Sequence, residues 1–260
     1  MKMPVNEMLD FRGKVVVVTG AGQGMGVGIA RRFGQAGATV ALTCRSSREK
    51  AEAVRDEIRR YGVPAQVFQL DQSSPEDCAR MIAEVAAAFG RVDVLVNNAG
   101  ININRGTLDL EEDVWDRVMD TNVKGFFFCS RAAAKQMIAQ GSGGSIVSIA
   151  SINGYTPLPD GAHYGASKAG IIMGTRSLAM DFGQYGIRVN AVAPGLMDAP
   201  GLDQAVPGWR ERYVSRAPLG RIGDWEDVGN VCLFLASPMA GWVTGQTIIA
   251  DGGVVLAPAY

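Results

Sequence analysis

A run of four valines that ends at a cluster of glycines constrains the fold of this chain more than any other feature. Val15–Val18 form an apolar run without alternation, which predicts a strand buried on both faces. Glycines then recur at alternate positions, at Gly20, Gly22, Gly24 and Gly26. Apolar residues at helical spacing begin at Ile29. The stretch therefore predicts a strand, a tight glycine turn and a helix whose first free N–H groups attract phosphate.

Strands and helices alternate to the end of the chain. Six further strands are predicted from apolar runs, at Thr39–Cys44, Gln66–Leu70, Val92–Val96, Ser145–Ile149, Ile187–Val192 and Gln246–Ala250. Helical spacing and capping signals predict helices at Glu49–Tyr61, Pro75–Phe89, Glu111 or Asp113 to Ala139, Gly161–Gln184 and Trp225–Leu235. This order predicts an α/β fold, a doubly wound parallel sheet of about seven strands with helices on both faces. No linker divides the chain, so we expect residues 1–260 to form a single domain.

Charge and composition exclude several kinds of partner. The formal net charge is −1, with basic and acidic residues interspersed, so we expect neither nucleic acid nor an acidic lipid surface to be bound. No apolar run reaches the roughly 18 residues that span a membrane, and Met1–Lys14 has no apolar signal core. A cytoplasmic location is expected. The four cysteines are far apart and there is one histidine, so we expect reduced core thiols and no metal site.

Polar residues follow the third and fourth predicted strands. Asp71 stands just past one strand, and Asn97-Asn98-Ala99-Gly100 stands just past the next. Each could be ordinary turn chemistry. Together they lie at one edge of the sheet, where open α/β sheets bind ligands.

The end of the second strand bears on which dinucleotide such a turn would hold. An acidic residue there, about 20 residues beyond the glycines, would bind the ribose hydroxyls of NAD. This chain instead has Cys44, Arg45 and Ser46. A guanidinium suits a 2′-phosphate by charge and geometry, so NADP(H) is the preferred cofactor and NAD(H) a possible one. The alternative is that Arg45 is a solvated charge at a strand end.

A tyrosine and a lysine four residues apart carry the strongest chemical signal. Tyr164 and Lys168 project from one helix face. An ammonium nearby favours the phenolate, so it would lower a tyrosine pKa that is ordinarily about 10. Ser151 follows an apolar strand beside that helix, and Asn122 interrupts the packed face of another. A pair of this kind can move a proton to or from a substrate oxygen.

On these motifs the chain resembles the short-chain dehydrogenase/reductase family, over nearly its whole length. The resemblance implies a Rossmann-type NAD(P)-binding domain and a catalytic set of Asn122, Ser151, Tyr164 and Lys168. In the family, the tyrosine is the general acid or base, and the lysine lowers its pKa and holds the nicotinamide ribose. The serine positions the substrate oxygen, and the asparagine supports a water that leads to bulk solvent.

The resemblance also implies which residues contact the cofactor. Besides Tyr164 and Lys168 these are Gly20, Gly22, Gln23, Gly24, Met25, Gly26, Arg45, Ser46, Asp71, Gln72, Asn98, Ala99, Gly100, Pro194, Gly195 and Met197. Relatives often carry a threonine where this chain has Ala199. We therefore expect another group to hold the nicotinamide carboxamide here.

The substrate is the least determined part of the prediction. Residues 196–220 are irregular and apolar, which predicts a lid over cofactor and substrate. Two interpretations are open for Tyr155, Leu158, His163, Leu196 and Trp209: they line an apolar pocket, or they only pack, and packing is favoured for each of them. We expect a small free ketone or secondary alcohol.

Several alternatives stay open. One is a 3-oxoacyl-carrier-protein reductase, although Tyr185 stands where such reductases often have a basic residue. Others are an NAD-dependent sugar or alcohol dehydrogenase and a non-catalytic dinucleotide-binding sensor. The family resemblance also implies a homotetramer.

Overall fold

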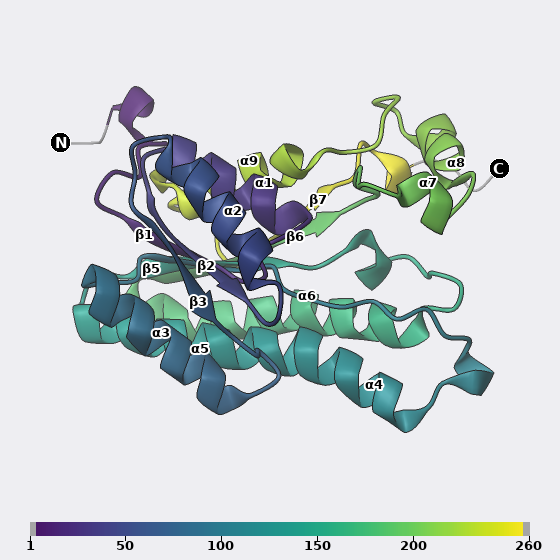
Figure 1. The fold of residues 1–260 in the computed structure, drawn as a ribbon, viewed down its shortest axis with the longest axis horizontal. Coiled ribbons are helices and arrows are strands. Elements are labelled where there is room, and N and C mark those ends of the chain that lie inside the picture. Colours follow the sequence, from purple (N-terminus) through teal and green to yellow (C-terminus); the bar gives the residue numbers. More distant parts are fainter. Residues whose placement is uncertain (1–3, 257–260) are drawn as a thin grey trace.

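A single parallel sheet forms the centre of the protein (Figure 1). The computed structural model describes residues 4–256, and the ends of the predicted domain 1–260 lie outside them. Within that range the sheet has seven parallel strands in the order β3-β2-β1-β4-β5-β6-β7. The strands are β1 Val15–Val18, β2 Thr39–Cys44, β3 Ala65–Gln69, β4 Val94–Asn97, β5 Gly144–Ile149, β6 Ile187–Pro194 and β7 Thr247–Ala250. Each strand lies within two residues of its predicted bounds, and the predicted α/β doubly wound fold is confirmed.

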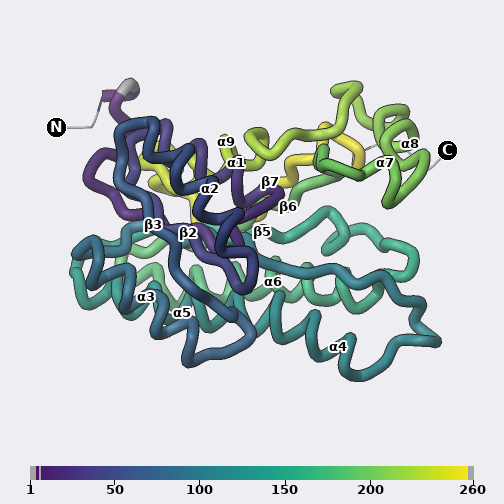
Figure 2. The backbone as a smooth tube through the Cα atoms, in the orientation of Figure 1, coloured from purple at the N-terminus to yellow at the C-terminus, as the bar shows by residue number. Residues whose placement is uncertain are grey.

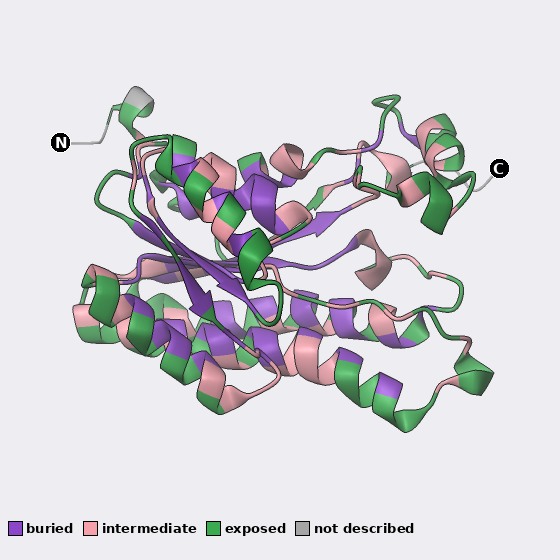
Figure 3. Cartoon of the chain, viewed as in Figure 1, coloured by how far each residue is buried: buried purple, intermediate pink, exposed green. Residues whose placement is uncertain are grey.

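Helices cover both faces of the sheet, and β1 shows why. Val16 and Val18 pack into one hydrophobic core, whereas Val15 and Val17 pack into the other. The helices of the first face are α1 Met25–Gln35, α2 Arg48–Arg59 and α9 Trp225–Ala236, and those of the second are α3 Pro75–Phe89, α4 Glu112–Met119, α5 Gly125–Gln140 and α6 Ala162–Phe182 (Figure 1). The five inner strands β1, β2, β4, β5 and β6 are almost wholly buried between the two layers, whereas the edge strands β3 and β7 are partly exposed (Figure 3). The chain order reverses between β1 and β4, so the switch point of the sheet lies beside the glycine turn.

The long helix predicted from Glu111 or Asp113 to Ala139 is broken. Between α4 and α5 the residues Asp120–Lys124 form one turn of π-helix. Such turns insert one residue into an α-helix and are often found at functional sites. The buried Asn122 lies in this turn. The prediction of one regular helix was therefore wrong. The helix is broken at Asn122, the polar residue that interrupts its packed face.

The predicted irregular segment 196–220 contains two short helices. These are α7 Leu202–Ala205 and α8 Trp209–Arg216. They lie at the end of the molecule toward which β6 runs (Figure 2). Tyr213 of α8 donates a hydrogen bond of 2.6 Å to the carbonyl of Asp251. The segment is thus tied to the chain that follows β7.

Two further features bear on the sequence predictions. None of the described helices has the length and apolarity needed to traverse a lipid bilayer. All four cysteines are buried free thiols, as predicted. Cys78 of α3 and Cys129 of α5 bring their sulfur atoms within 3.3 Å.

Candidate active site

Two threonines hold the glycine turn in place. The Thr43 hydroxyl accepts a hydrogen bond of 3.2 Å from the N–H of Gly20. The Thr19 hydroxyl accepts hydrogen bonds from the N–H groups of Asn98 at 3.0 Å and Ala99 at 2.9 Å. The Asn98 side chain donates back to the carbonyl of Thr19 at 2.8 Å. These bonds join the end of β1 to the end of β4. Gly24 precedes α1 with a φ of +57° and no side chain caps this helix, so its first N–H groups remain free to bind an anion.

A cavity of about 350 Å³ opens above this turn. It is lined by most of the residues predicted to contact the cofactor: Gly20, Gly22, Gln23, Gly24, Met25, Arg45, Ser46, Asp71, Gln72, Asn98, Ala99 and Gly100. The sequence prediction missed a further set, namely Thr43, Cys44, Ser47, Leu70, Ile101 and Thr121. Most of these flank the ends of β2, β3 and β4, so their place at the strand ends was the signal that could have found them. Glycines at an open helix end fit the phosphates of a dinucleotide.

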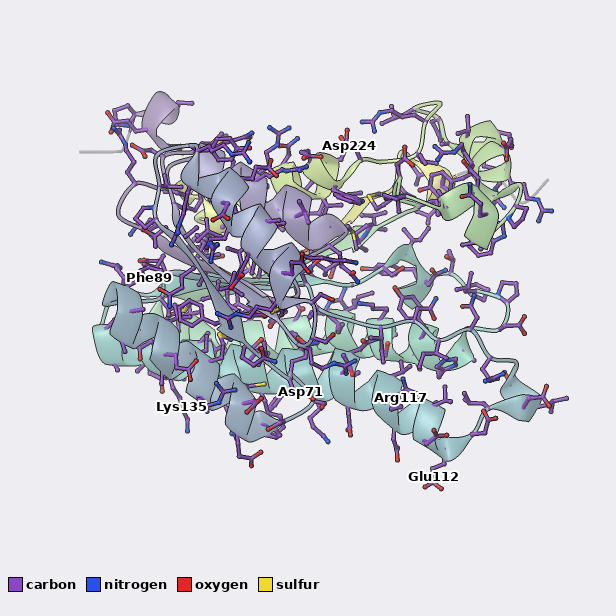
Figure 4. All side chains as sticks on the ribbon, viewed as in Figure 1. Asp71, Phe89, Glu112, Arg117, Lys135 and Asp224 are labelled. Atoms are coloured by element: carbon purple, nitrogen blue, oxygen red, sulfur yellow. The ribbon has the colours of Figure 1, made fainter. Side chains whose placement is uncertain are left out.

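Three of the predicted contact residues have roles within the protein. Gly26 permits a close approach, because a Cβ atom there would lie 2.6 Å from the carbonyl oxygen of Gly20. The Gln72 amide donates to the carbonyls of Ala99 at 2.8 Å and Thr121 at 2.7 Å. Asp71, labelled in Figure 4, accepts bonds from the backbone and the hydroxyl of Ser73. Gln72 therefore braces the cavity wall, as well as lining it.

Arg45 is an exposed cation on the cavity wall. It forms no ion pair with any of the described residues, whereas Arg48 pairs with Glu52 at 3.0 Å. The hydroxyls of Ser46 and Ser47 lie beside it on the same wall. This donor set fits a phosphate on the ribose.

The four predicted catalytic residues come from three elements. Ser151 follows β5, Tyr164 and Lys168 lie in α6, and Asn122 lies in the π-helical turn. The Ser151 side chain lies close enough to the Tyr164 phenol to lower its pKa. The Lys168 ammonium lies 5.6 Å from the centroid of the Tyr164 ring. The structure thus brings the tyrosine, serine and lysine together.

Gly100 joins this cluster to the cavity. A Cβ atom at Gly100 would lie 3.2 Å from Oδ1 of Asn122 and 3.5 Å from Nζ of Lys168. Gly100 also lines the cavity above the glycine turn. The four polar groups therefore lie directly beyond the cavity, along the edge of the sheet.

Burial sets the proton affinities in this cluster. It raises the pKa of Tyr164 above its ordinary value, and the nearby Ser151 side chain offsets part of this shift. Burial also lowers the pKa of Lys168 to about 8, because a charged amine loses hydration there. The Lys168 ammonium donates at 2.9 Å to the carbonyl of Ile149. Burial, and not the neighbouring ammonium, therefore dominates the pKa of Tyr164, contrary to the prediction from spacing.

Asn122 satisfies the backbone of the loop after β4. Its Oδ1 atom accepts from the N–H of Ile101 at 2.8 Å, and its Nδ2 atom donates to the carbonyl of Ile101 at 2.9 Å. Nδ2 also donates to the Ser167 hydroxyl at 3.0 Å. The amide is thereby fully engaged at a buried position, as expected for a polar group in a packed helix.

The residues predicted around the nicotinamide and the substrate are spread more widely. Pro194 ends β6 and is buried. Gly195 leaves no room for a side chain, since a Cβ atom there would overlap the Tyr213 hydroxyl. Met197 packs against Gly223 and lines a second cavity of about 600 Å³, so its side chain points away from the first one.

His163 does not line an exposed pocket. It is fully buried, and its Nε2 atom lies 2.7 Å from the carbonyl oxygen of Ile103. Tyr155 and Trp209 are partly exposed, at 47% and 37%. The buried imidazole anchors the loop after β4, which agrees with the packing interpretation that the sequence analysis favoured for His163.

Comparison with known proteins gives consistent results. Residues 20–255 match the family model described as Enoyl-(Acyl carrier protein) reductase. The 3-oxoacyl-(acyl-carrier-protein) reductase of Staphylococcus aureus is 41% identical over 243 residues, which cover 94% of this chain and 98% of that protein.

Solved structures resemble the whole fold. A protein of Sinorhizobium meliloti designated a short-chain alcohol dehydrogenase has 37% identity and a TM-score of 0.92, covering 96% of this chain and all of that one. Acetoin dehydrogenase from Enterobacter cloacae has 35% identity and a TM-score of 0.87, covering 95% and 97%. The chain belongs to the short-chain dehydrogenase/reductase family, oxidoreductases that act on CH–OH and C=O groups with a nicotinamide dinucleotide.

Proposed function

We propose that this enzyme interconverts a ketone and a secondary alcohol with NADP(H), and that Tyr164 is its general acid and base. The convergence of Ser151, Tyr164 and Lys168 beside Gly100 is the observation that carries the proposal. It supports a proton-transferring role for Tyr164 next to the cavity whose lining suits a dinucleotide. The proposal is tested by following the absorbance of NADPH while a panel of ketones and alcohols is supplied.

Each polar group has a distinct task in this proposal. A bound nicotinamide dinucleotide supplies the hydride donor or acceptor. Tyr164 transfers the proton to or from the substrate oxygen, and the Ser151 hydroxyl donates a hydrogen bond to that oxygen. Lys168 has a pKa of about 8, so it can take up and release protons near neutral pH. Asn122 holds the loop at Ile101 and supports the water path from Lys168 to solvent.

The preference for NADP(H) rests on Arg45. Its guanidinium lies on the cavity wall and has no carboxylate partner among the described residues. No acidic side chain takes the place at the end of β2, where Cys44 stands. The contacts assigned to the glycine turn, Arg45, Ser46, Asp71 and Asn98–Gly100 belong to the same proposal. Kinetics with both dinucleotides test the preference.

The substrate we propose is a small free ketone or secondary alcohol. Acetoin dehydrogenase, with a TM-score of 0.87, supports this choice. A second candidate is a carrier-bound 3-oxoacyl group. It is supported by the 41% identity to the 3-oxoacyl-(acyl-carrier-protein) reductase of Staphylococcus aureus. Tyr185 is exposed, with 47% of its surface accessible, and it offers no positive charge to an acidic carrier. Parallel assays with carrier-bound and free 3-oxoacyl substrates decide between the two.

We also propose that residues 1–260 form one NAD(P)-binding domain whose segment 196–220 is a lid. The short helices α7 and α8 and the Tyr213 anchor support this role.

A homotetramer is proposed for the assembly. Helices α5 and α6 expose Phe127, Met173 and Met180, and the region of β7 exposes Ile249 and Leu256. Two exposed apolar areas are what two interfaces require. Light scattering tests the assembly, and a monomer would contradict it.

A further inference from the structure

The turn that follows β5 binds the Ser151 hydroxyl through its backbone. The Ser151 hydroxyl oxygen accepts a hydrogen bond of 3.1 Å from the backbone N–H of Asn153. Gly154 packs the turn against α6, because a Cβ atom there would lie 3.0 Å from the backbone of Lys168. The bond to Ser151 comes from the backbone, so it does not depend on which side chain stands at position 153.

The Asn153 side chain adds a second contact of a different kind. The Ser151 hydroxyl donates to Oδ1 of Asn153 at 3.3 Å. Asn153 is half-buried, and its Nδ2 atom donates to none of the residues in 4–256. A carboxamide with a free N–H₂ group therefore lies one hydrogen-bond length beyond the hydroxyl that faces Tyr164.

We infer that Asn153 binds a second oxygen of the substrate, on the carbon next to the reacting carbonyl. This inference rests on the proposed ketone and alcohol chemistry at Ser151 and Tyr164. When the Ser151 hydroxyl turns to the reacting oxygen, it gives up its bond to the Asn153 amide. Oxygens on adjacent carbons lie about 3 Å apart, which is close to a hydrogen-bond length. The Asn153 carboxamide oxygen lies 3.3 Å from the Ser151 oxygen, so a second oxygen beside the reacting one would be within reach of the same carboxamide.

The Asn153 carboxamide can bind the second oxygen whether the carbon that carries it is a ketone or an alcohol. A second carbonyl accepts a bond from Nδ2, and a hydroxyl donates one to Oδ1. The substrate class is therefore an α-diketone or an α-hydroxyketone. In the reduction the reacting carbon gains a hydride from the reduced dinucleotide and its oxygen gains a proton from Tyr164. The C=O π bond is lost, the dinucleotide is oxidised, and the second oxygen keeps its bonds.

Four small probes test this inference on the full-length enzyme with NADPH or NADH. Butane-2,3-dione and 3-hydroxybutan-2-one carry the adjacent oxygen, butan-2-one lacks it, and ethyl 3-oxobutanoate carries it one carbon farther away. For Asn153→Leu we expect about a tenfold loss of kcat/KM on the first two probes, chiefly through KM, and less than about a twofold change on butan-2-one. Asn153→Asp keeps an acceptor but no donor, so its kcat/KM should fall less on 3-hydroxybutan-2-one than on butane-2,3-dione. Asn230→Leu on the exposed face of α9 is the matched control and should change none of these values.

The other results overturn the inference in two distinguishable ways. If Asn153→Leu lowers kcat/KM equally on all active probes, Asn153 only supports Ser151 and the inference is wrong while the proposed function stands. If the wild-type enzyme turns over other ketones of the panel but neither butane-2,3-dione nor 3-hydroxybutan-2-one, the inference is wrong while the proposed function stands. If it turns over no ketone or alcohol of the panel with either dinucleotide, the proposed function fails and the inference fails with it. An unfolding curve for Asn153→Leu that matches the wild type shows that the comparison concerns the site.

Discussion

The ammonium of Lys168 points to the carbonyl of Ile149, at 2.9 Å, and not to the phenol of Tyr164. The two side chains still lie close, with 5.6 Å between the nitrogen and the ring centroid. Each is shifted toward its neutral form by burial. The resting site therefore holds a protonated phenol, which is the form required to donate a proton to a ketone.

Removing the phenol hydroxyl should stop turnover. We expect Tyr164→Phe to lower kcat by about a thousandfold or more, because the phenol is the group that we propose transfers the proton to the substrate oxygen. Binding of the dinucleotide should change little, since the cavity is lined by other residues. Stopped-flow rates and a fluorescence titration with NADPH measure the two effects separately. Activity close to that of the wild type would remove Tyr164 from its proposed role.

Lys168 should make stability depend on pH in an unusual direction. Its pKa is about 8 in the folded chain, below the ordinary value of 10.5. Between these values the unfolded chain binds more protons, so this group's contribution to the free energy of unfolding rises with pH. Near neutral pH the buried ammonium carries its full desolvation cost. We therefore expect Lys168→Met to be more stable than the wild type. Its advantage in the free energy of unfolding should be about 2 kcal/mol larger at about pH 7 than at about pH 9.5.

Urea denaturation of both proteins at the two pH values measures this difference. A gain that is the same at both values would show that the lysine is not destabilised by burial. Activity should be lost in Lys168→Met at either pH, which separates its catalytic role from its effect on stability.

Arg45 should decide between the two dinucleotides. We expect Arg45→Asp to lower the ratio of kcat/KM for NADPH over NADH by about a hundredfold, because a carboxylate repels a 2′-phosphate and accepts bonds from ribose hydroxyls. Arg48→Asp is the matched control, since Arg48 already pairs with Glu52. An unchanged ratio in Arg45→Asp would mean that Arg45 is only a solvated charge.

The hydroxyl of Thr19 should stabilise both the sheet and the cofactor site. Thr19→Val has nearly the same shape but leaves the N–H groups of Asn98 and Ala99 without an acceptor. We expect a loss of about 2–4 kcal/mol in the free energy of unfolding and weaker dinucleotide binding. Thr19→Ser keeps the oxygen and should lose far less. The idea fails if the valine and serine variants are equally stable.

The Tyr213 anchor should control the segment 196–220. Its hydroxyl donates to Asp251, and burial raises its pKa to about 12, so the bond persists at all ordinary pH values. We expect Tyr213→Phe to raise KM severalfold and to speed proteolytic cleavage within 196–220. Tyr185→Phe, at an exposed position, is the control. Unchanged cleavage would argue against a hinged lid.

The sequence predicted those parts of the structure that local pattern determines. The valines of β1 have to be buried on both faces, and only a sheet between two helix layers does this. Glycine at positions 20 and 24 reflects positive φ angles, which are local requirements. The spacing of Tyr164 and Lys168 likewise follows from helix geometry alone.

Features that depend on distant contacts escaped prediction. The π-helical turn is stabilised by Asn122 reaching Ile101, a contact that no local pattern encodes. Helices α7 and α8 have no buried residues, so they lack the apolar face from which a helix is predicted. The pKa of Tyr164 follows from burial, which only the packed structure reveals.

The π-helical turn also restricts how many residues can connect α4 to α5. It holds one residue more than an α-helix of the same span. Deleting Asp120, Thr121, Val123 or Lys124 would allow an unbroken α-helix from α4 to α5, but it would remove the wide turn that carries Asn122. The amide at Asn122 would then face away from the loop that it now pairs with. This segment should accept exchanges of side chains far more readily than a change in the number of its residues.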